Sequence, residues 1–289
     1  FAGKGDITAV RAQSLGNVFE IDGGKATANS LVKVDSDTYA LAYTGADNDG
    51  FISTFTISSD GTTITEVDNL EHDTEFASDN HLVKVDSDTY ALAYRGPGND
   101  GFISTFTIDS DGNITAVKTQ SEGNNLEHNT DYAHQNSLVQ VDSDTYALAY
   151  TGADNDGFIS TFTIDSDGNI TAVNSLEHVE HGTEVIDDNH LVHVDSDTYA
   201  LAYSIQNNSG YISTFTISDD GSTITELDNL EHDTAMGSWW QGLVKVDSDT
   251  IAYAYHDVPL GYQGYIATFT IGDTSTDDST STESKKPSG

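Results

Sequence analysis

Apolar and polar residues alternate with a period of two along most of this chain. Thr38 to Tyr43 alternates aromatic and aliphatic residues with threonine and alanine, and Phe51 to Ile57 alternates apolar residues with serine and threonine. Such alternation, rich in β-branched and aromatic residues, is typical of β-strands. The pattern predicts four strands, at Leu31 to Val34, Thr38 to Tyr43, Phe51 to Ile57 and Thr63 to Val67.

Between these strands the sequence has the composition of tight turns. Residues 35–37 (Asp-Ser-Asp) follow the first predicted strand, and residues 58–61 (Ser-Ser-Asp-Gly) follow the third. Aspartate and serine side chains accept hydrogen bonds from their own backbone, and glycine adopts positive φ without a steric penalty. The four strands are therefore expected to form one antiparallel sheet.

This four-strand block occurs five times. Each copy begins with a Leu-Val pair, at Leu31, Leu82, Leu138, Leu191 and Leu243. The copies are spaced about 52 residues apart, a period typical of propellers and arrays. The fourth-strand motif stands at Ile64, Ile114, Ile170 and Ile224. It is missing after Ile271, but the same motif stands at the start of the chain, from Asp6 to Val10.

Four-stranded antiparallel sheets repeated about a ring form a β-propeller. The five copies predict an all-β, five-bladed β-propeller with four antiparallel strands per blade, spanning residues 1–272 as a single domain. Residues 6–10 would complete the fifth blade. A linear array is the competing architecture, but it does not explain why the two ends are complementary halves of one copy. Residues 273–289 are rich in Ser, Thr and Asp and are interpreted as a tail or linker.

The repeat length, the four-strand blocks and the divided fifth copy resemble those of five-bladed β-propellers. That group includes tachylectin-type lectins and several glycoside hydrolase families. The near-identical Leu-Val-x-Val-Asp-Ser-Asp-Thr blocks also resemble repeats of large extracellular surface proteins. The resemblance covers roughly residues 5–272 and is one of architecture, because no lectin or hydrolase signature maps onto the chain residue by residue. A fold shared in this way does not by itself decide function.

Composition excludes several classes of function. Ten Lys and Arg residues stand against 48 Asp and Glu residues, a formal net charge of −38. This argues against nucleic acid and anionic membranes as partners, because both bind basic patches. The chain contains no cysteine, so disulfides and thiol chemistry are excluded. No apolar run approaches membrane-spanning length. We expect a secreted or cell-surface protein that is one module of a longer chain.

A Glu-His pair recurs in the predicted connectors between copies. Its histidines are His72, His128, His181 and His232, and the counterpart in the first connector is Glu20-Ile21. Such pairs could act in acid–base catalysis, as metal ligands or as repeated ligand contacts. The alternative is that each histidine caps its connector by hydrogen bonding to backbone. The fourfold repetition favours this structural role, because an enzyme normally has one active site.

The predicted loops between the second and third strands contain acidic residues near glycine. Asp47, Asp49, Asp154 and Asp156 form half of an Asp-x-Asp-x-Asp-Gly calcium loop, but no glutamate closes the loop at position twelve. Asn-Asp-Gly sequences also favour turns. Calcium is the one cofactor that these loops leave open.

The fifth copy departs from the consensus at two places. Its entering connector contains both tryptophans of the chain, and its loop after the second strand is longer than the others. Aromatic faces beside a few polar groups suit the binding of sugars. The candidate ligand-binding residues are Trp239, Trp240, His256, Asp257, Tyr262 and Gln263. Equally, the tryptophans could plug the ring where the closing blade packs less regularly.

These observations favour a non-catalytic binding module. It would bind glycans, as a lectin does, or mediate adhesion, through the rim formed by the loops and connectors, and several similar sites would act together. One alternative is a structural or protein-binding repeat domain of a surface protein. Another is a glycoside hydrolase-like enzyme, which needs two carboxylates at a defined separation. Among 48 acidic residues no such pair stands out, so no catalytic residue is assigned.

Overall fold

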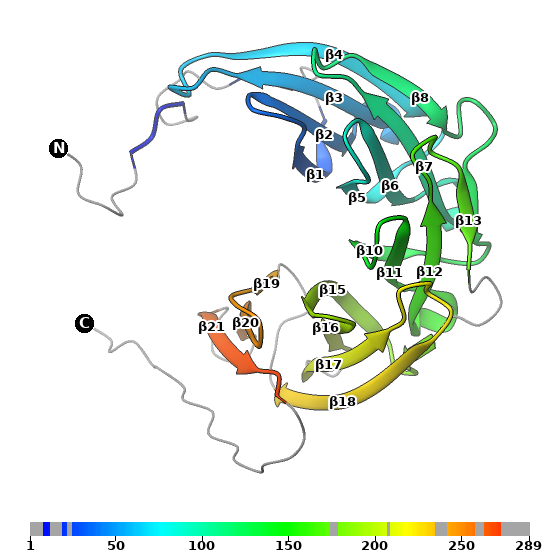
Figure 1. Ribbon diagram of the computed structural model, residues 1–289, viewed down its shortest axis with the longest axis vertical. Helices are drawn as coiled ribbons and strands as arrows, with labels where there is room; N and C mark the ends of the chain where they lie inside the picture. The colour runs from blue at the N-terminus through cyan, green and yellow to red at the C-terminus, as the bar shows by residue number, and fades with distance from the viewer. Residues whose placement is uncertain are drawn as a thin grey trace. The chain divides into compact units, whose positions relative to one another are not determined.

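The computed structural model describes residues 8–11, 19–21, 25–173, 179–206, 209–234, 242–257 and 263–272. The protein is all-β, and its five antiparallel sheets of three to five strands are consistent with a five-bladed β-propeller (Figure 1). The chain divides into two compact units. The first comprises Phe1–Leu138 and Thr163–Ala172, and the second comprises Val139–Phe162 and Val173–Gly289.

The first two sheets each follow one copy of the repeat. The first has the order β1 (Thr27–Lys33), β2 (Thr38–Thr44), β3 (Gly50–Ile57) and β4 (Ile64–Asp73). The second has the order β5 (Ser78–Lys84), β6 (Thr89–Arg95), β7 (Gly101–Ile108) and β8 (Ile114–Lys118), and β9 (Leu126–Asn129) also pairs with β7. Strands adjacent in sequence are thus adjacent in the sheet.

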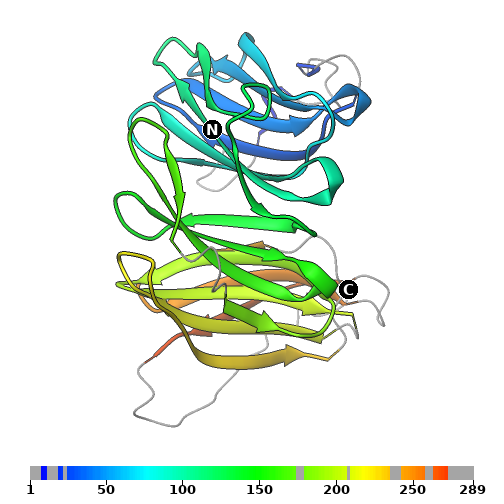
Figure 2. The ribbon, with the colours of Figure 1, turned by 90° about the vertical axis from the view of Figure 1, so that its right-hand side faces the viewer.

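The other three sheets repeat this order. The third contains β10 (His134–Gln140), β11 (Thr145–Thr151), β12 (Gly157–Ile164) and β13 (Ile170–Ala172), with β14 (Val179–Gly182) also paired to β12. The fourth contains β15 (Ile186–Asp195), β16 (Thr198–Ile205), β17 (Ser209–Ile217) and β18 (Ile224–Asp233). The fifth contains β19 (Gly242–Lys245), β20 (Thr250–Asp257) and β21 (Gln263–Thr270). Figure 2 shows the long strands β17 and β18, in yellow, side by side.

Two predicted strand boundaries were wrong. The fourth strand of the first copy does not end at Val67 but continues as β4 to Asp73, because a bulge between Thr54 and Phe55 takes up Val67 and lets the pairing go on. Glu71 and His72 therefore lie in a strand and not in a connector. The first strand begins at Thr27, four residues before Leu31, and also contains a bulge.

The core lies between successive sheets. In the first unit, Ile52 of β3 packs with Leu82, Tyr94 and Phe106 of the second sheet. In the second unit, Ile159 of β12 packs with Leu191, Tyr203 and Phe215 of the fourth sheet by the same repeat positions. Alanines at alternate positions of the second strand, such as Ala40, are fully buried. Each of these apolar interfaces is thus formed by two successive sheets, and each sheet contributes one half.

A repeated hydrogen bond joins each sheet to the turn of the next. The hydroxyl of Thr54 donates to the carbonyl of Gly112 at 2.5 Å, and Thr105 donates to Gly168 at 2.8 Å. In the second unit, Thr161 donates to the carbonyl of Gly221 at 2.7 Å. These glycines have positive φ, so the turn depends on them.

The predicted closing strand is not shown by the structure. Asp6 and Ile7 lie outside the described residues, and Thr8–Val10 form no strand, so closure stays a prediction. Val10 nevertheless contacts the turn at Gly61, with its Cγ1 3.4 Å from the point where a Cβ on that glycine would lie. Val67 of β4 contacts Gly112 of the next sheet in the same way, at 3.1 Å.

A second contact of the N-terminal segment follows the same rule. Ile21 packs on Tyr43 and Phe55 of the first sheet. The ring of Phe19 also meets that of Phe55 edge-on, with centroids 5.4 Å apart. His72, the counterpart of Ile21 one copy later, packs on the equivalent rings of the second sheet. Phe19 and Ile21 therefore contact the first sheet at places equivalent to those where His72 contacts the second sheet.

Candidate functional site

The repeated histidines pack between sheets. The His72 ring meets Tyr94 and Phe106 of the second sheet edge-on, with centroids 5.0 and 5.8 Å away. It also covers Gly50, where a Cβ would lie 2.6 Å from the His72 Cε1 atom. His181 and His232 make the same aromatic contacts in the second unit, and His128 covers Gly101.

Packing, and not hydrogen bonding, holds His72 and His232. Among the described residues, neither ring nitrogen of His72 or of His232 has a hydrogen-bond partner. The expected bond to backbone is therefore not what fixes these two. Burial lowers the pKa of His72, His128 and His181 to about 3 and that of His232 to about 4. All four rings are neutral at pH 7.

The candidate calcium loops are short turns. Asp47 and Asp154 are exposed and have positive φ, and glycine stands at the equivalent place in the second copy. Asp49 approaches Glu71. Desolvation raises the pKa of Glu71, and the hydrogen bond and charge of Asp49 raise it further. Glu127 and Asp100 repeat this pairing. Within the described part of the chain, no group of three or more His, Asp or Glu side chains could hold a metal ion.

The first strand of each of the first four sheets opens with a strained residue. Ala28, Asp79, Gln135 and Asp188 occupy the same place in the first four copies, and each has φ between 50° and 57°. Pairing with the second strand shifts register across this place. Residues other than glycine rarely adopt positive φ, and the bulge turns the side chain away from regular alternation.

Side chains of the following copy hold the bulge. The amide of Asn80 donates to the carbonyl of Ala28 at 3.1 Å, and that of Asn136 donates to the carbonyl of Asp79 at 3.2 Å. Two positions after the bulge, Ser30 accepts from the backbone of Leu82 at 2.9 Å, and Nδ1 of His81 accepts from that of Leu138 at 2.6 Å. The scaffold around the bulge is thus repeated.

The residues that this scaffold presents vary from copy to copy. Three repeat positions are here called the variable rim positions, and in the first four sheets they lie at the end that carries the loop after the second strand. The residue before the bulge is Thr27, Ser78, His134, Asp187 or Trp239. The bulge residue is Ala28, Asp79, Gln135, Asp188 or Trp240. The residue after the repeated Tyr of the second strand is Thr44, Arg95, Thr151, Ser204 or His256.

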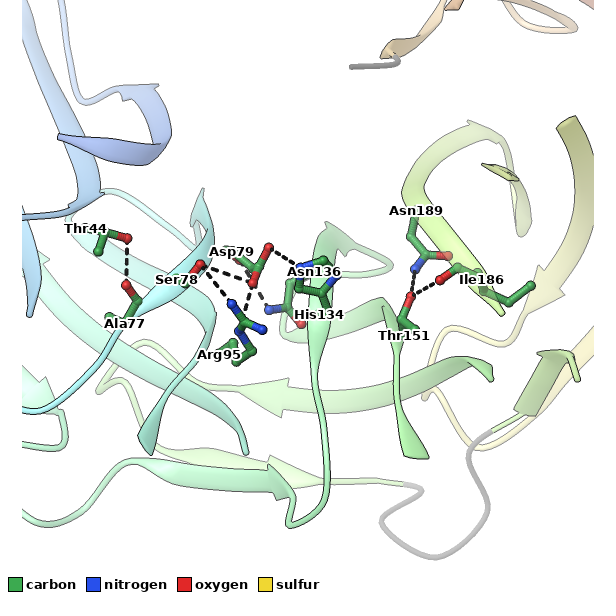
Figure 3. Close-up of polar contacts among 10 residues, drawn as sticks. All are labelled: Thr44, Ala77, Ser78, Asp79, Arg95, His134, Asn136, Thr151, Ile186 and Asn189. Carbon is green, nitrogen blue, oxygen red and sulfur yellow. Dashed lines mark hydrogen bonds and ion pairs between the residues drawn. The ribbon is translucent and has the colours of Figure 1, made fainter. Parts of the chain in front are cut away.

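In two copies the second strand ends in a threonine that serves as a tie. Thr44 donates to the carbonyl of Ala77 at 2.6 Å (Figure 3). In the second unit, Thr151 donates to the carbonyl of Ile186 at 3.1 Å and accepts from Asn189 at 3.0 Å. Each bond joins the strand to the connector or first strand of the next copy.

Arg95 replaces this threonine in the second copy, and a polar cluster surrounds it. Its Nε lies 3.1 Å from Oδ2 of Asp79, and His134 Nε2 lies 3.4 Å from Oδ1 of the same carboxylate (Figure 3). Ser78 donates to Oδ2 of Asp79 at 3.2 Å. The Arg95 and Asp79 side chains are 18% and 16% exposed, so solvent reaches both.

Two aromatic rings flank the guanidinium. Its central carbon lies 5.4 Å from the centre of the Phe76 ring and 5.9 Å from that of Tyr132. Tyr132 also stacks on His134, with centroids 5.8 Å apart. These contacts fix the plane of the guanidinium, since a cation over an aromatic face is attracted to it.

The fourth copy places two neighbouring carboxyl groups, Asp187 and Asp188, at the variable rim positions. Burial, and after it the charge of Asp187, raises the pKa of Asp188 to about 7. The side chain therefore exchanges its proton near neutral pH, where a ligand hydroxyl could meet it as either donor or acceptor.

The predicted site of the fifth copy is only partly described. Trp239, Trp240 and Tyr262 lie outside the described residues. His256 is half-buried near the end of β20, and the backbone of Asp257 pairs with that of Gln263.

Sequence reasoning missed the Arg95 cluster. Arg95, Asp79 and His134 come from two copies, and no local pattern joins them. The available signal was Arg95 itself, which breaks an otherwise exact seven-residue copy ending in Thr44 and Thr151. By spacing from the Leu-Val pairs, Trp240 and His256 hold the same repeat positions as Asp79 and Arg95.

Comparisons with known proteins support the fold of the chain but no specific function. No family model and no curated protein matches the chain. A protein of known structure from Lactobacillus plantarum is 15% identical, covering 86% of this chain and 67% of its own, with a TM-score of 0.59. The periplasmic gluconolactonase of Pseudomonas aeruginosa is 12% identical over 85% of this chain and 86% of its own, with a TM-score of 0.44.

A GH43 β-xylosidase/α-arabinofuranosidase from a compost microbial metagenome is 13% identical. It matches 88% of this chain and 93% of its own, with a TM-score of 0.45. At such identity a likeness concerns architecture and carries no site residues. The chain has a β-propeller fold. Of the helical segments in the described residues, none is long and apolar enough to span a membrane.

Proposed function

We propose that the protein is a non-catalytic binding module of a secreted or cell-surface protein. It recognises glycans through the variable rim positions of its copies. One observation carries the proposal: a strained backbone recurs at the same place in four copies, while the side chain there is alanine in one, glutamine in another and aspartate in the other two.

Strain of this kind favours a functional reading. A non-glycine residue at positive φ costs on the order of 1 kcal/mol, and such residues cluster at ligand-binding places. If only the fold required the bulge, glycine would serve in every copy. Instead the bulge residue is Ala28, Asp79, Gln135 or Asp188, although the asparagine one residue later is the same in all four copies.

The chemistry of these side chains suits sugars. Asp, Gln, His and Arg donate to and accept from hydroxyl groups, and aromatic rings stack on the apolar faces of pyranoses. The fifth copy adds Trp239 and Trp240 at the same repeat positions. Several similar sites on one module would bind a repeating glycan much more tightly than one site does.

A glycan array probed with and without calcium tests the proposal. We expect binding to a subset of glycans. Replacing Trp239 and Trp240 together by alanine should weaken binding at least tenfold and leave the fold unchanged. Ser87→Ala, in the turn at the other end of the second sheet, is the control and should not change affinity.

One outcome would decide against glycan binding, and another would only remove the two tryptophans from the site. An array without any bound glycan, in both the presence and absence of calcium, would leave a protein-binding or structural repeat domain as the better description. A double tryptophan variant that unfolds would assign these residues to packing, and the array would then be repeated with the Arg95→Thr variant.

A further inference from the structure

We infer that Arg95, Asp79 and His134 form a binding site for a sugar that carries a carboxylate, that is, a hexuronic acid. The inference rests on the proposed function and names the ligand class of one of its sites. It starts from the single copy in which a permanent cation stands at a variable rim position.

The protein contacts the guanidinium of Arg95 along one edge only, at Nε and Nη2. Its Nε faces Asp79 at 3.1 Å, and its Nη2 makes only a long contact of 3.5 Å to the hydroxyl of Ser78. Among the described residues, Nη1 has no hydrogen-bond acceptor. An arginine has five N–H donors in a fixed fork, so most of this capacity is left for a ligand.

The charge of the cluster is less negative than that of the rest of the chain, which favours an acidic ligand here over other places. The permanent charge of Arg95 balances the single carboxylate of Asp79, and the His134 ring faces the same carboxylate. The chain has only one other arginine, Arg11, and a formal net charge of −38, so this cluster is an exception to its surroundings. Charges beyond about 8 Å are screened at physiological salt, so the charges of the cluster itself decide whether an anion binds there.

The geometry selects a planar anion attached to a ring. Two parallel N–H groups of a guanidinium match the two oxygens of a carboxylate. Phe76 and Tyr132 lie against the guanidinium within 5.9 Å, and their half-exposed rings offer apolar surface beside it. A pyranose with a carboxylate at C6 can engage both features, with Asp79 accepting from a hydroxyl group.

The test compares two sugars that differ only at C6. Methyl β-D-glucuronide and methyl β-D-glucoside are titrated into the full chain at physiological salt, and binding is followed by calorimetry or by NMR line shifts. We expect the glucuronide to bind about tenfold more tightly or better, because a charge-assisted hydrogen bond exceeds a neutral one.

Arg95→Thr is the matched variant, because threonine is the residue of the first and third copies and already fits this scaffold. It should abolish the preference for glucuronide. Lys84→Gln removes one positive charge from the same sheet by copying Gln140 of the third copy. It should keep the preference, which separates the site from net charge.

The outcomes separate this inference from the proposed function. Equal affinity for the two sugars in the unchanged chain, or a preference that survives Arg95→Thr, would overturn the inference while glycan binding stands. If neither sugar binds and the array is also empty, both fall. A preference lost in Arg95→Thr and kept in Lys84→Gln supports the site.

Discussion

The second and fifth copies of the repeat share a template but differ in what covers them. Ile103 of β7 is fully buried, whereas Ile266, its counterpart on β21, is 78% exposed. A Cβ on Gly101 would lie 2.5 Å from the ring of His128, while no atom lies within 4 Å of that place on Gly264. The burial of a residue therefore depends on what packs over its strand and not on the sequence of the strand itself.

The first copy shows the complementary difference. Leu31 is 63% exposed, and the equivalent Leu82 of the second copy is 2% exposed. Each copy is thus half of an interface, which its neighbour completes, as in other repeat proteins. Within the described residues no neighbouring sheet covers Leu31 or Ile266, and closure of the fifth sheet by residues 6–10 stays a prediction.

The largest expected effect is acid destabilisation through the four buried histidines. Burial holds the pKa of His72, His128 and His181 at about 3, below the ordinary value near 6.5. Stability is therefore full above pH 6.5 and falls as the pH drops toward 3, because only the unfolded chain takes up the protons. Between these two pKa values, each histidine lowers the free energy of unfolding by about 1.4 kcal/mol for every unit by which the pH falls.

Urea unfolding from pH 7.5 to 4.5 measures this slope. The raised pKa values of the largely buried Asp188 and Asp73 act in the opposite direction and offset part of this slope, whereas those of Glu71 and Glu127 add less because both side chains are largely exposed. His72→Ile copies the natural Ile21 and should reduce the slope by about 1.4 kcal/mol per pH unit. An unchanged slope in that variant would contradict the assignment.

The next effect concerns the start of the chain. Deleting residues 1–21 removes the contacts of Phe19 and Ile21 with Phe55, and in a closed ring also the fourth strand of the fifth sheet. We expect a loss on the order of 4 kcal/mol, since each large apolar side chain contributes about 2 kcal/mol, and a Tm lower by roughly 10 °C.

Deleting residues 273–289 is the control for this experiment and should shift Tm by less than about 2 °C. Calorimetry on both deletions gives the comparison. Equal, small shifts would mean that the N-terminal segment does not close the fifth sheet.

The sequence predicted the sheets but not the Arg95 cluster, for a physical reason. Alternation and turn residues are local, so each copy reveals its strands by itself. A bulge breaks alternation, and the extensions at Thr27 and Asp73 were missed for that reason. The cluster depends on side chains from two copies, and only the folded interface brings Asp79 and His134 to Arg95.

A smaller effect follows from the glycines under the histidines. Gly101→Ala places a Cβ against the His128 ring and should cost about 1–3 kcal/mol, because overpacking shifts neighbouring atoms. In a closed ring, Ile21 would cover Gly264, and Gly264→Ala should then cost a similar amount. The cost should vanish in the chain that lacks residues 1–21, which a double-mutant cycle measures. A neutral Gly264→Ala in the full chain would argue for an open fifth sheet.

The smallest expected effect concerns the hydrogen bond from a threonine of the third strand to the turn of the next sheet. Thr105 is fully buried and donates to the carbonyl of Gly168, so Thr105→Val should cost about 1 kcal/mol, the value of one such bond. Thr268 is its counterpart on β21 and is exposed. If the ring closes, Thr268 donates to the carbonyl of Gly61, the turn that Val10 already contacts, and Thr268→Val should cost as much as Thr105→Val. Valine keeps the shape of threonine, so the difference between the two losses in urea unfolding isolates the hydroxyl. A loss at Thr105 without one at Thr268 would mean that the fifth sheet lacks the hydrogen bond that the first three sheets make to the next turn, and the predicted closure would fail at this contact.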